Sequence, residues 1–297
     1  KNFIFDHKYI SNLIIYMIKY CSPGNGDKKG ISCLPYRELQ YIARLLNEII
    51  ITKNKGKTKN DESFLPTIRV SEKHKDLKGQ IEETLKKMNQ CDKEICWLQM
   101  KELKDKLTDT KYNQLKEYFR PEKPFQWNDN PNEWLTTENI NDVMEQYEKA
   151  YPNFKYYGAL PIDFCKVTDL CSINLSDLFK QNINSFGVVF NVDPSNKGGQ
   201  HWFSMYVDLI MKNHNKPFIY YFDSASKGNS NIQSQIFNFI EIIQNQYKEL
   251  KNKELGFTFN DIQHQYQNTE CGIYCLHFLT EMLRGRNFID YIHNKIS

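Results

Sequence analysis

The first 120 residues combine amphipathic helical segments with polar connections. Hydrophobic residues recur there at spacings of three and four, which predicts helices over these segments: His7–Tyr20, Tyr36–Ile51, Leu77–Met88, Glu94–Leu107 and Tyr112–Phe119. Pro35 precedes the second segment and suits the first turn of a helix. The Lys-, Asn- and Gly-rich segment Lys53–Asp61 is typical of a solvated connection. We therefore expect a mostly helical N-terminal region over residues 1–120.

After Pro121 and Pro124 the pattern changes to short runs of aromatic and β-branched residues. A short helix is expected over Trp134-Leu135 and Ile140–Tyr151. Four later runs predict strands: Phe186–Val192, His201–Ile210, Phe218–Phe222 and Phe257–Ile262. Between the last two, Ile232 to Leu250 has the period of an amphipathic helix, and a final helix begins near Cys271. This order of elements predicts an α+β domain over residues 121–297.

Composition and charge narrow the class of protein. The chain has 297 residues, 40% hydrophobic and 25% charged, which is enough for one large domain or two modest ones. No uninterrupted apolar segment reaches the length that spans a bilayer, so we expect no membrane association. The formal charge of +3 is too small to argue for nucleic acid. The lysine-rich helices are expected to expose solvated faces; a nucleic-acid or membrane surface is the alternative.

The eight cysteines form no CxxC pair, and their spacings fit no common zinc template. They are Cys21, Cys33, Cys91, Cys96, Cys165, Cys171, Cys271 and Cys275. We therefore expect no metal site. Because the sequence contains no secretory segment, reduced thiols are also expected.

Three residues at predicted element boundaries could form a cysteine hydrolase site. Cys271 lies at the start of the final helix, where unpaired N–H groups and the helix dipole favour a thiolate. His201 opens one strand and could take up and return a proton as general base and acid. Asp223 closes the next strand and could orient the imidazole. No metal or organic cofactor is needed for this chemistry.

An amide could complete the site. Gln265 and Gln267 precede Cys271 by six and four residues, and either side chain could donate to an oxyanion together with the backbone N–H of Cys271. Gly272 would leave room for a substrate backbone. Each residue also has a structural alternative: Cys271 as a small buried hydrophobe, the histidine as a structural residue, and Asp223 as a turn residue.

At these residues the chain resembles the Ulp/adenain superfamily of cysteine proteases, which includes SUMO-specific proteases, the adenovirus maturation protease and proteases of large DNA viruses. The resemblance covers roughly residues 125–297 and is carried by these segments: Trp134-Leu135 with Asn141-Asp142, His201-Trp202, Tyr221-Phe222-Asp223-Ser224, and Gln265 through Cys271-Gly272. It implies a mixed central sheet flanked by helices, with the nucleophile at the start of a helix. It also favours Gln265 over Gln267 in the oxyanion hole.

Within this superfamily, the segments Asn191–Trp202 and Asn268–Gly272 resemble most the polyprotein protease of African swine fever virus. Glu270 stands where SUMO proteases usually carry aspartate. The resemblance implies protein substrates cut after Gly-Gly or Gly-X, threaded through a tunnel between Trp134 and Trp202. An ordinary role for both rings in an aromatic core is the alternative. The resemblance further implies that the source is a giant DNA virus, such as a mimivirus relative. It also implies that the protein is located in the viral factory of the host cytoplasm and in the virion.

Three functions follow from these observations. The first is a protease that matures viral structural polyproteins, and the second is an isopeptidase that removes SUMO or ubiquitin from host proteins. Both would use the same active site, so the motifs do not separate them. The third is an inactive protease fold that serves as a binding module. Residues 1–120 would then be a regulatory or recruiting arm. The oligomeric state does not follow from the sequence.

Overall fold

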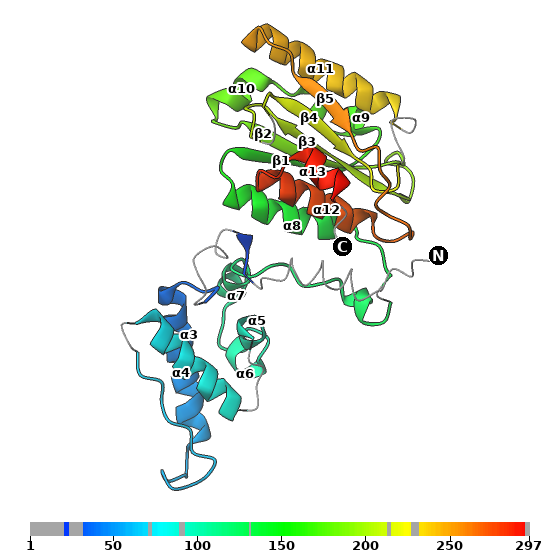
Figure 1. Cartoon of the computed structure of the whole chain (residues 1–297). Coiled ribbons are helices and arrows are strands. Elements are labelled where there is room, and N and C mark those ends of the chain that lie inside the picture. Colours follow the sequence, from blue (N-terminus) through cyan, green and yellow to red (C-terminus); the bar gives the residue numbers. More distant parts are fainter. Residues whose placement is uncertain are drawn as a thin grey trace. The chain divides into compact units, whose positions relative to one another are not determined.

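The computed structural model describes residues 21–23, 32–70, 73–88, 93–130, 132–212, 215–226 and 232–294 (Figure 1). Contacts divide the chain into two units, Lys1–Arg120 and Pro121–Ser297. The helix expected over residues 7–20 lies outside the described residues. Within the described ranges, no helix combines the length and the apolar character needed to cross a membrane.

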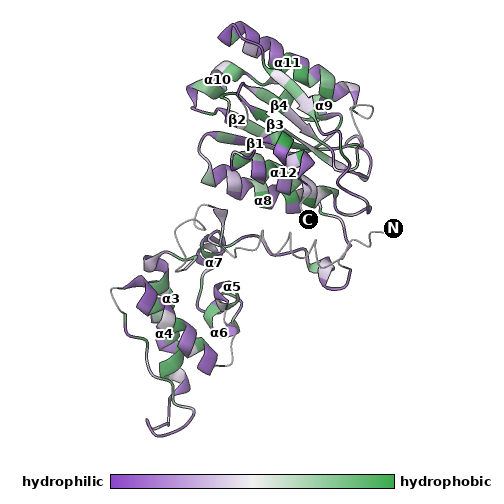
Figure 2. Cartoon of the chain, in the orientation of Figure 1, coloured by the Kyte–Doolittle hydropathy of each residue, from purple (hydrophilic) through white to green (hydrophobic). Residues whose placement is uncertain are grey.

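The first unit is helical, as its hydrophobic periodicity predicts. Its helices are α3 (Tyr36–Lys53), α4 (His74–Lys87), α5 (Glu94–Trp97), α6 (Lys101–Lys104) and α7 (Asp109–Lys116). The ribbons of α3 and α4 alternate between hydrophobic and hydrophilic stretches (Figure 2). Their apolar positions, among them Leu39, Ile42 and Ile81, are fully buried in one core of this unit.

The single helix expected over Glu94–Leu107 is wrong, because the structure divides this segment into α5 and α6. Between them Met100 is extended, with φ −61° and ψ 121°. Leu98 and Met100 are both buried. A continuous helix would direct residues two positions apart to different faces. The break therefore lets both side chains reach the core.

The expectation of reduced thiols is also wrong for several cysteines. Disulfides join Cys21 to Cys33 and Cys165 to Cys171, and Cys96 is disulfide-bonded as well. The Cα atoms of the two pairs lie 4.8 and 5.2 Å apart, within the range that a disulfide spans. In the described part of the chain, the free cysteines are Cys271 and Cys275, both buried.

The second unit is built around a five-stranded mixed sheet with the strand order β1-β2-β3-β4-β5. The strands are β1 (Phe154–Pro161), β2 (Ser185–Asn191), β3 (Trp202–Asp208), β4 (Phe218–Phe222) and β5 (Gly256–Phe259). The two central pairings, β2 with β3 and β3 with β4, are antiparallel, and both outer pairings are parallel. This architecture confirms the expected α+β fold with a mixed central sheet.

Strand β1 was not predicted from the sequence. It is an edge strand that contains Gly158 and ends at Pro161, two residue types that are depleted in strands. Gly158 has a φ of +102°, and the pairing with β2 shifts between Tyr156 and Ala159. The irregularity removes the regular alternation by which a strand is recognised in a sequence.

Helices cover both faces of this sheet (Figure 1). The helices of this unit are η1 (Phe125–Asn128), α8 (Thr137–Ala150), α9 (Phe164–Val167), η2 (Leu170–Ser172), α10 (Leu175–Lys180), α11 (Ser234–Lys251), α12 (Cys271–Leu283) and α13 (Phe288–His293). Alternate residues of a strand face opposite sides. Phe203 and Met205 of β3 share a core with Ile240 of α11. Trp202 and Ser204 consequently face the other layer, which holds α8 and α12.

The buried face of α11 should contribute much more to stability than its exposed end. Ile243 is completely buried against the sheet, whereas Leu250 on the same helix is 44% exposed. We expect Ile243→Ala to lower the free energy of unfolding by ~2–5 kcal/mol and Leu250→Ala by ~1 kcal/mol or less. Urea denaturation of both variants measures the difference, and equal losses would contradict this orientation of α11.

Candidate active site

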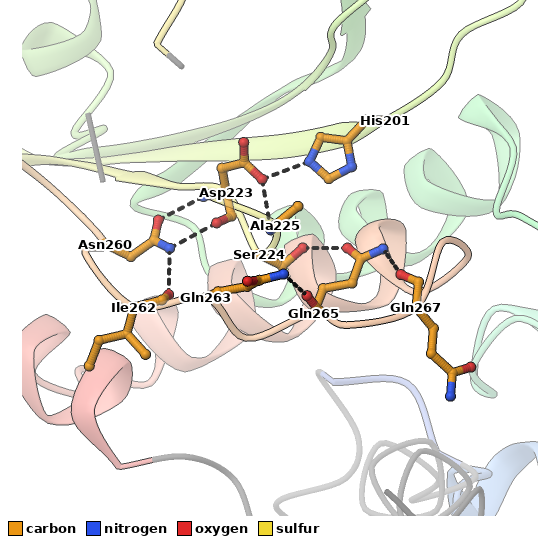
Figure 3. Close-up of polar contacts among 9 residues, drawn as sticks. All are labelled: His201, Asp223, Ser224, Ala225, Asn260, Ile262, Gln263, Gln265 and Gln267. Carbon is orange, nitrogen blue, oxygen red and sulfur yellow. Dashed lines mark hydrogen bonds and ion pairs between the residues drawn. The ribbon is translucent and has the colours of Figure 1, made fainter. Parts of the chain in front are cut away.

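His201 and Asp223 lie together at one end of the sheet. His201 immediately precedes β3 and Asp223 immediately follows β4, and these strands are antiparallel, so the two residues reach the same end. The His201 Nε2 atom is 2.6 Å from Oδ1 of Asp223 (Figure 3). His201 also forms a side-chain hydrogen bond with Cys271, the first residue of α12. The structure thus brings together three of the predicted residues from three different elements.

The surroundings of His201 favour its protonated form. Burial by itself lowers the pKa of His201, because it disfavours the charged imidazolium. Hydrogen bonds to Asp223 and Cys271 and the charges of both groups outweigh burial, and together they raise the pKa of His201 to about 9. With Nε2 bonded to Asp223, the other ring nitrogen is the one left for the thiol.

Two cysteines of α12 have different environments. Cys271 lies in the first turn, where backbone N–H groups have no partner within the helix. Cys275, one turn further on, is enclosed by the fold, and burial raises its pKa well above the usual value for a thiol. The Cys275 thiol forms a side-chain hydrogen bond with Ser204. Only Cys271 is therefore placed beside a base.

Asp223 is fixed by a residue that sequence reasoning missed, Asn260. The Asp223 backbone N–H donates to Asn260 Oδ1 at 2.9 Å, and Asn260 Nδ2 donates to the Asp223 carbonyl at 2.8 Å (Figure 3). Asn260 Nδ2 also donates to the carbonyl of Ile262 at 3.0 Å. The amide thus continues the pairing of β4 with β5 beyond the last residue of β5. The only sequence signal is a polar residue inside the predicted strand Phe257–Ile262.

The Asp223 carboxylate accepts a hydrogen bond within a turn in addition to its contact with the imidazole. Its Oδ1 accepts a hydrogen bond from the Ala225 backbone N–H at 3.0 Å, an arrangement typical of Asx turns. The two interpretations of Asp223, a turn residue and a partner of His201, therefore hold at the same time.

The structure distinguishes the two glutamines. Gln265 is 4% exposed, and its Oε1 accepts a hydrogen bond from Ser224 Oγ at 2.7 Å. Its Nε2 donates to the backbone carbonyl of Gln267. Gln267 itself is exposed, and its side chain points away from these contacts (Figure 3). Gln265 is thus the amide held beside Asp223-Ser224, whereas Gln267 contributes a backbone oxygen.

The loop that delivers His201 is held by Asn191, a second residue that the sequence did not indicate. Asn191 Oδ1 accepts from the backbone N–H groups of Asp193 and Gln200, at 3.0 and 3.3 Å. Gly199 has a φ of +76°, and a Cβ at this position would lie 2.6 Å from Asn191 Nδ2. Glycine is therefore required here both by backbone conformation and by space.

The residues expected to bind substrate converge on Leu135. The Trp202 indole N–H donates to the Leu135 carbonyl at 3.1 Å, and Trp202 is 7% exposed. Trp134, next to Leu135, is half-buried and precedes α8 rather than lying in it. A Cβ on Gly272 would lie 3.0 Å from Leu135 Cβ. The space beside Gly272, expected to admit a substrate backbone, is occupied by this leucine.

The similarity of the chain to known proteins extends beyond the residues of this site. The family model described as YopJ serine/threonine acetyltransferase matches residues 99–297, about two thirds of the chain, so the chain belongs to that family. A protein of Acanthamoeba polyphaga mimivirus, named as a thiol protease, is 30% identical over 283 residues. The alignment covers 93% of this chain and 88% of the mimivirus protein.

African swine fever virus supplies both a sequence relative and a solved structure. Its SUMO-1 cysteine protease, from a warthog isolate, is 25% identical over 177 residues, which cover 55% of this chain and 63% of that protein. The crystal structure of the protease of this virus has a TM-score of 0.63 at 20% identity, and covers 94% of this chain and 90% of that chain.

Two of these similarities extend beyond the range of the expected resemblance. The similarity was expected over residues 125–297, yet the mimivirus alignment and the solved structure each cover more than nine tenths of the chain. The similarity to the mimivirus protein and the shared fold thus extend into the helical first unit. The mimivirus protein is named as a thiol protease, and the African swine fever virus structure with the same fold is also that of a protease. Within its family, the chain is a viral cysteine protease of the SUMO-protease-like type.

Proposed function

We propose that the chain is an endopeptidase that cleaves viral structural polyproteins after Gly-Gly or Gly-X. Cys271 would be the nucleophile, His201 the general base and acid, Asp223 the residue that orients the imidazole, and Gln265 an oxyanion donor. The observation that carries this proposal is the continuous contact from Cys271 through His201 to Asp223. A thiol, an imidazole and a carboxylate in this order are the groups that activate a cysteine for acyl transfer.

The first half of the reaction forms a thioester. His201 holds the proton of the thiol as imidazolium, and the Cys271 thiolate attacks the scissile carbonyl carbon. The negative charge that develops on the carbonyl oxygen is stabilised by the backbone N–H of Cys271 and by Gln265 Nε2. The C–N bond then breaks, and the imidazolium gives its proton to the leaving amine.

The second half restores the enzyme. Neutral His201 takes a proton from water, and the resulting hydroxide attacks the thioester carbonyl. The same donors stabilise the second oxyanion before the C–S bond breaks. Throughout, Asp223 binds the far ring nitrogen at 2.6 Å and stabilises the positive charge of His201.

Selectivity for glycine would come from exclusion of side chains. In this proposal Trp134 and Trp202, joined through Leu135, border the path of the substrate to Cys271. Flat rings close to the substrate backbone leave no room for a Cβ atom, so larger residues are rejected by steric conflict.

Two other reactions are supported by specific comparisons. The name SUMO-1 cysteine protease, carried by the African swine fever virus relative, supports cleavage of ubiquitin-like conjugates. The description of the matching family model supports transfer of an acetyl group to serine or threonine. All three reactions can begin with acyl transfer to a thiolate, and they differ in the acyl donor and in the final acceptor.

Cleavage should depend on Cys271 and not on Cys275. We expect Cys271→Ala to abolish hydrolysis of a Gly-Gly-X peptide, because the thioester cannot form. Cys275→Ala, one turn along the same helix, should retain activity. The assay measures both variants on the peptide, on SUMO and ubiquitin fusions, and on a serine peptide with acetyl coenzyme A. Activity of Cys271→Ala would exclude the thiol mechanism. Cys271-dependent cleavage of a fusion alone would favour the isopeptidase, and Cys271-dependent turnover of acetyl coenzyme A alone would favour acetyl transfer.

The alkaline limit of activity should follow His201. Since its pKa is raised to about 9, the imidazolium persists at neutral pH and is lost as the pH rises through that value. We expect kcat/KM to fall above about pH 9. Asp223→Asn removes the main partner, so the limit should move to lower pH and kcat should drop ~10²–10⁴-fold. Asp177→Asn in α10 is the matched control. If the alkaline limit were the same in Asp223→Asn as in the wild type, the role of the carboxylate would be refuted.

Glycine selectivity should weaken when the tunnel is opened. Trp134→Ala removes a half-buried ring, whereas Trp127→Ala removes a half-buried ring outside the proposed tunnel. We expect Trp134→Ala to improve cleavage after Gly-Ala relative to Gly-Gly by ~10-fold or more, the discrimination that a single methyl group typically supports. A peptide panel measures kcat/KM for each variant. Unchanged preference in Trp134→Ala, or the same change in both variants, would exclude the tunnel.

A further inference from the structure

We infer that Ser224 is a positioning residue that orients the side-chain amide of Gln265, so that Nε2 and not Oε1 is presented to the oxyanion. This inference rests on the proposed role of Gln265 as an oxyanion donor. Ser224 follows Asp223 directly and is 1% exposed. Its hydroxyl therefore interacts with protein groups and not with bulk water.

Two contacts decide which end of the Gln265 amide faces which partner. The backbone carbonyl of Gln267 can only accept, so the donating Nε2 must face it. Oε1 then faces Ser224, whose hydroxyl donates to it at 2.7 Å (Figure 3). A flipped amide would place Oε1 against the Gln267 carbonyl, where two acceptors repel each other. One hydrogen of Nε2 binds Gln267, and the second is left for an acceptor in the site.

The backbone of Ser224 forms hydrogen bonds that are separate from the one made by its hydroxyl. Its carbonyl accepts hydrogen bonds from the backbone N–H groups of His264 and Gln265, at 2.8 and 2.7 Å. These bonds hold the loop before α12 against the end of β4. They do not involve the hydroxyl, so Ser224→Ala should leave the loop in place and remove only the bond to the amide.

Loss of the hydroxyl should act on the transition state. Without it, the buried Oε1 of Gln265 loses its partner, and an unsatisfied buried acceptor favours rotation of the amide away from its position. Rotation would withdraw Nε2 from the oxyanion. Removal of a whole oxyanion donor costs ~10²–10³-fold in kcat, so we expect a loss of ~10-fold or more for Ser224→Ala. KM should change little, since the substrate in its ground state carries no oxyanion.

The test is a double-mutant cycle on the Gly-Gly-X peptide with Ser224→Ala, Gln265→Ala and the double variant. Ser226→Ala is the matched control, because Ser226 lies in the same turn and is 2% exposed. Ser224→Cys keeps a weaker donor and should lose less kcat than Ser224→Ala. Thermal unfolding of each variant verifies the fold, and the alkaline limit should stay at that of the wild type because His201 and Asp223 are untouched.

The expected result is that Ser224→Ala lowers kcat in the wild type but has no further effect when Gln265 is alanine. If Gln265→Ala is slow and the two losses multiply, Ser224 acts independently and the inference is overturned. The same holds if Ser224→Ala has wild-type kcat, or if Ser226→Ala is equally slow. If Gln265→Ala itself has wild-type kcat, the proposed role of Gln265 fails, and with it the role of Ser224.

Discussion

The antiparallel pairing of β3 with β4 is the constraint on which the candidate site depends. Ser204 pairs with Phe222, so the start of β3 and the end of β4 coincide at one end of the sheet. This register brings His201 close to Asp223, although 22 residues separate them in the sequence. Helix α12 packs against β3 and brings its first residue, Cys271, to the same place.

Buried polar contacts keep this end of the sheet fixed. Asp223, Ser224, Asn260 and Gln265 are each less than 9% exposed, and each has a hydrogen-bond partner within the group. A buried polar atom without a partner would cost free energy, so the contacts hold one another in a single arrangement. The side chains of the candidate site thus need little reorganisation, which is the condition under which fixed dipoles stabilise a transition state well.

The sequence predicts those parts of the fold and the site that depend on local pattern. Cys271, His201 and Asp223 could be proposed because each lies at the boundary of a predicted element and has distinctive chemistry. Asn260 and Ser224 could not be assigned in this way. Their partners lie 37 and 41 residues away, and such pairings are decided by tertiary packing. Asparagine and serine are also common at the ends of strands for local reasons.

The same distinction explains the remaining differences. Helices with regular periodicity, such as α3 and α11, were predicted within a few residues of their observed bounds. Strand β1 was missed because Gly158 and Pro161 disrupt its pattern. The disulfide between Cys165 and Cys171 depends on a separation of Cα atoms that spacing along the chain does not define. The choice of Gln265 over Gln267 needed the family resemblance, since both residues lie at plausible distances from Cys271.

The adjacency of Asp223 and Ser224 has a consequence for how this protein can change during evolution. One residue contacts the imidazole and the next contacts the amide, so the insertion or deletion of a single residue in β4 would displace both contacts together. Point substitutions elsewhere in the strand carry no such double effect. The connection over residues 209–217 joins β3 to β4 at the opposite end of the sheet, so a change in its length would leave both contacts in place.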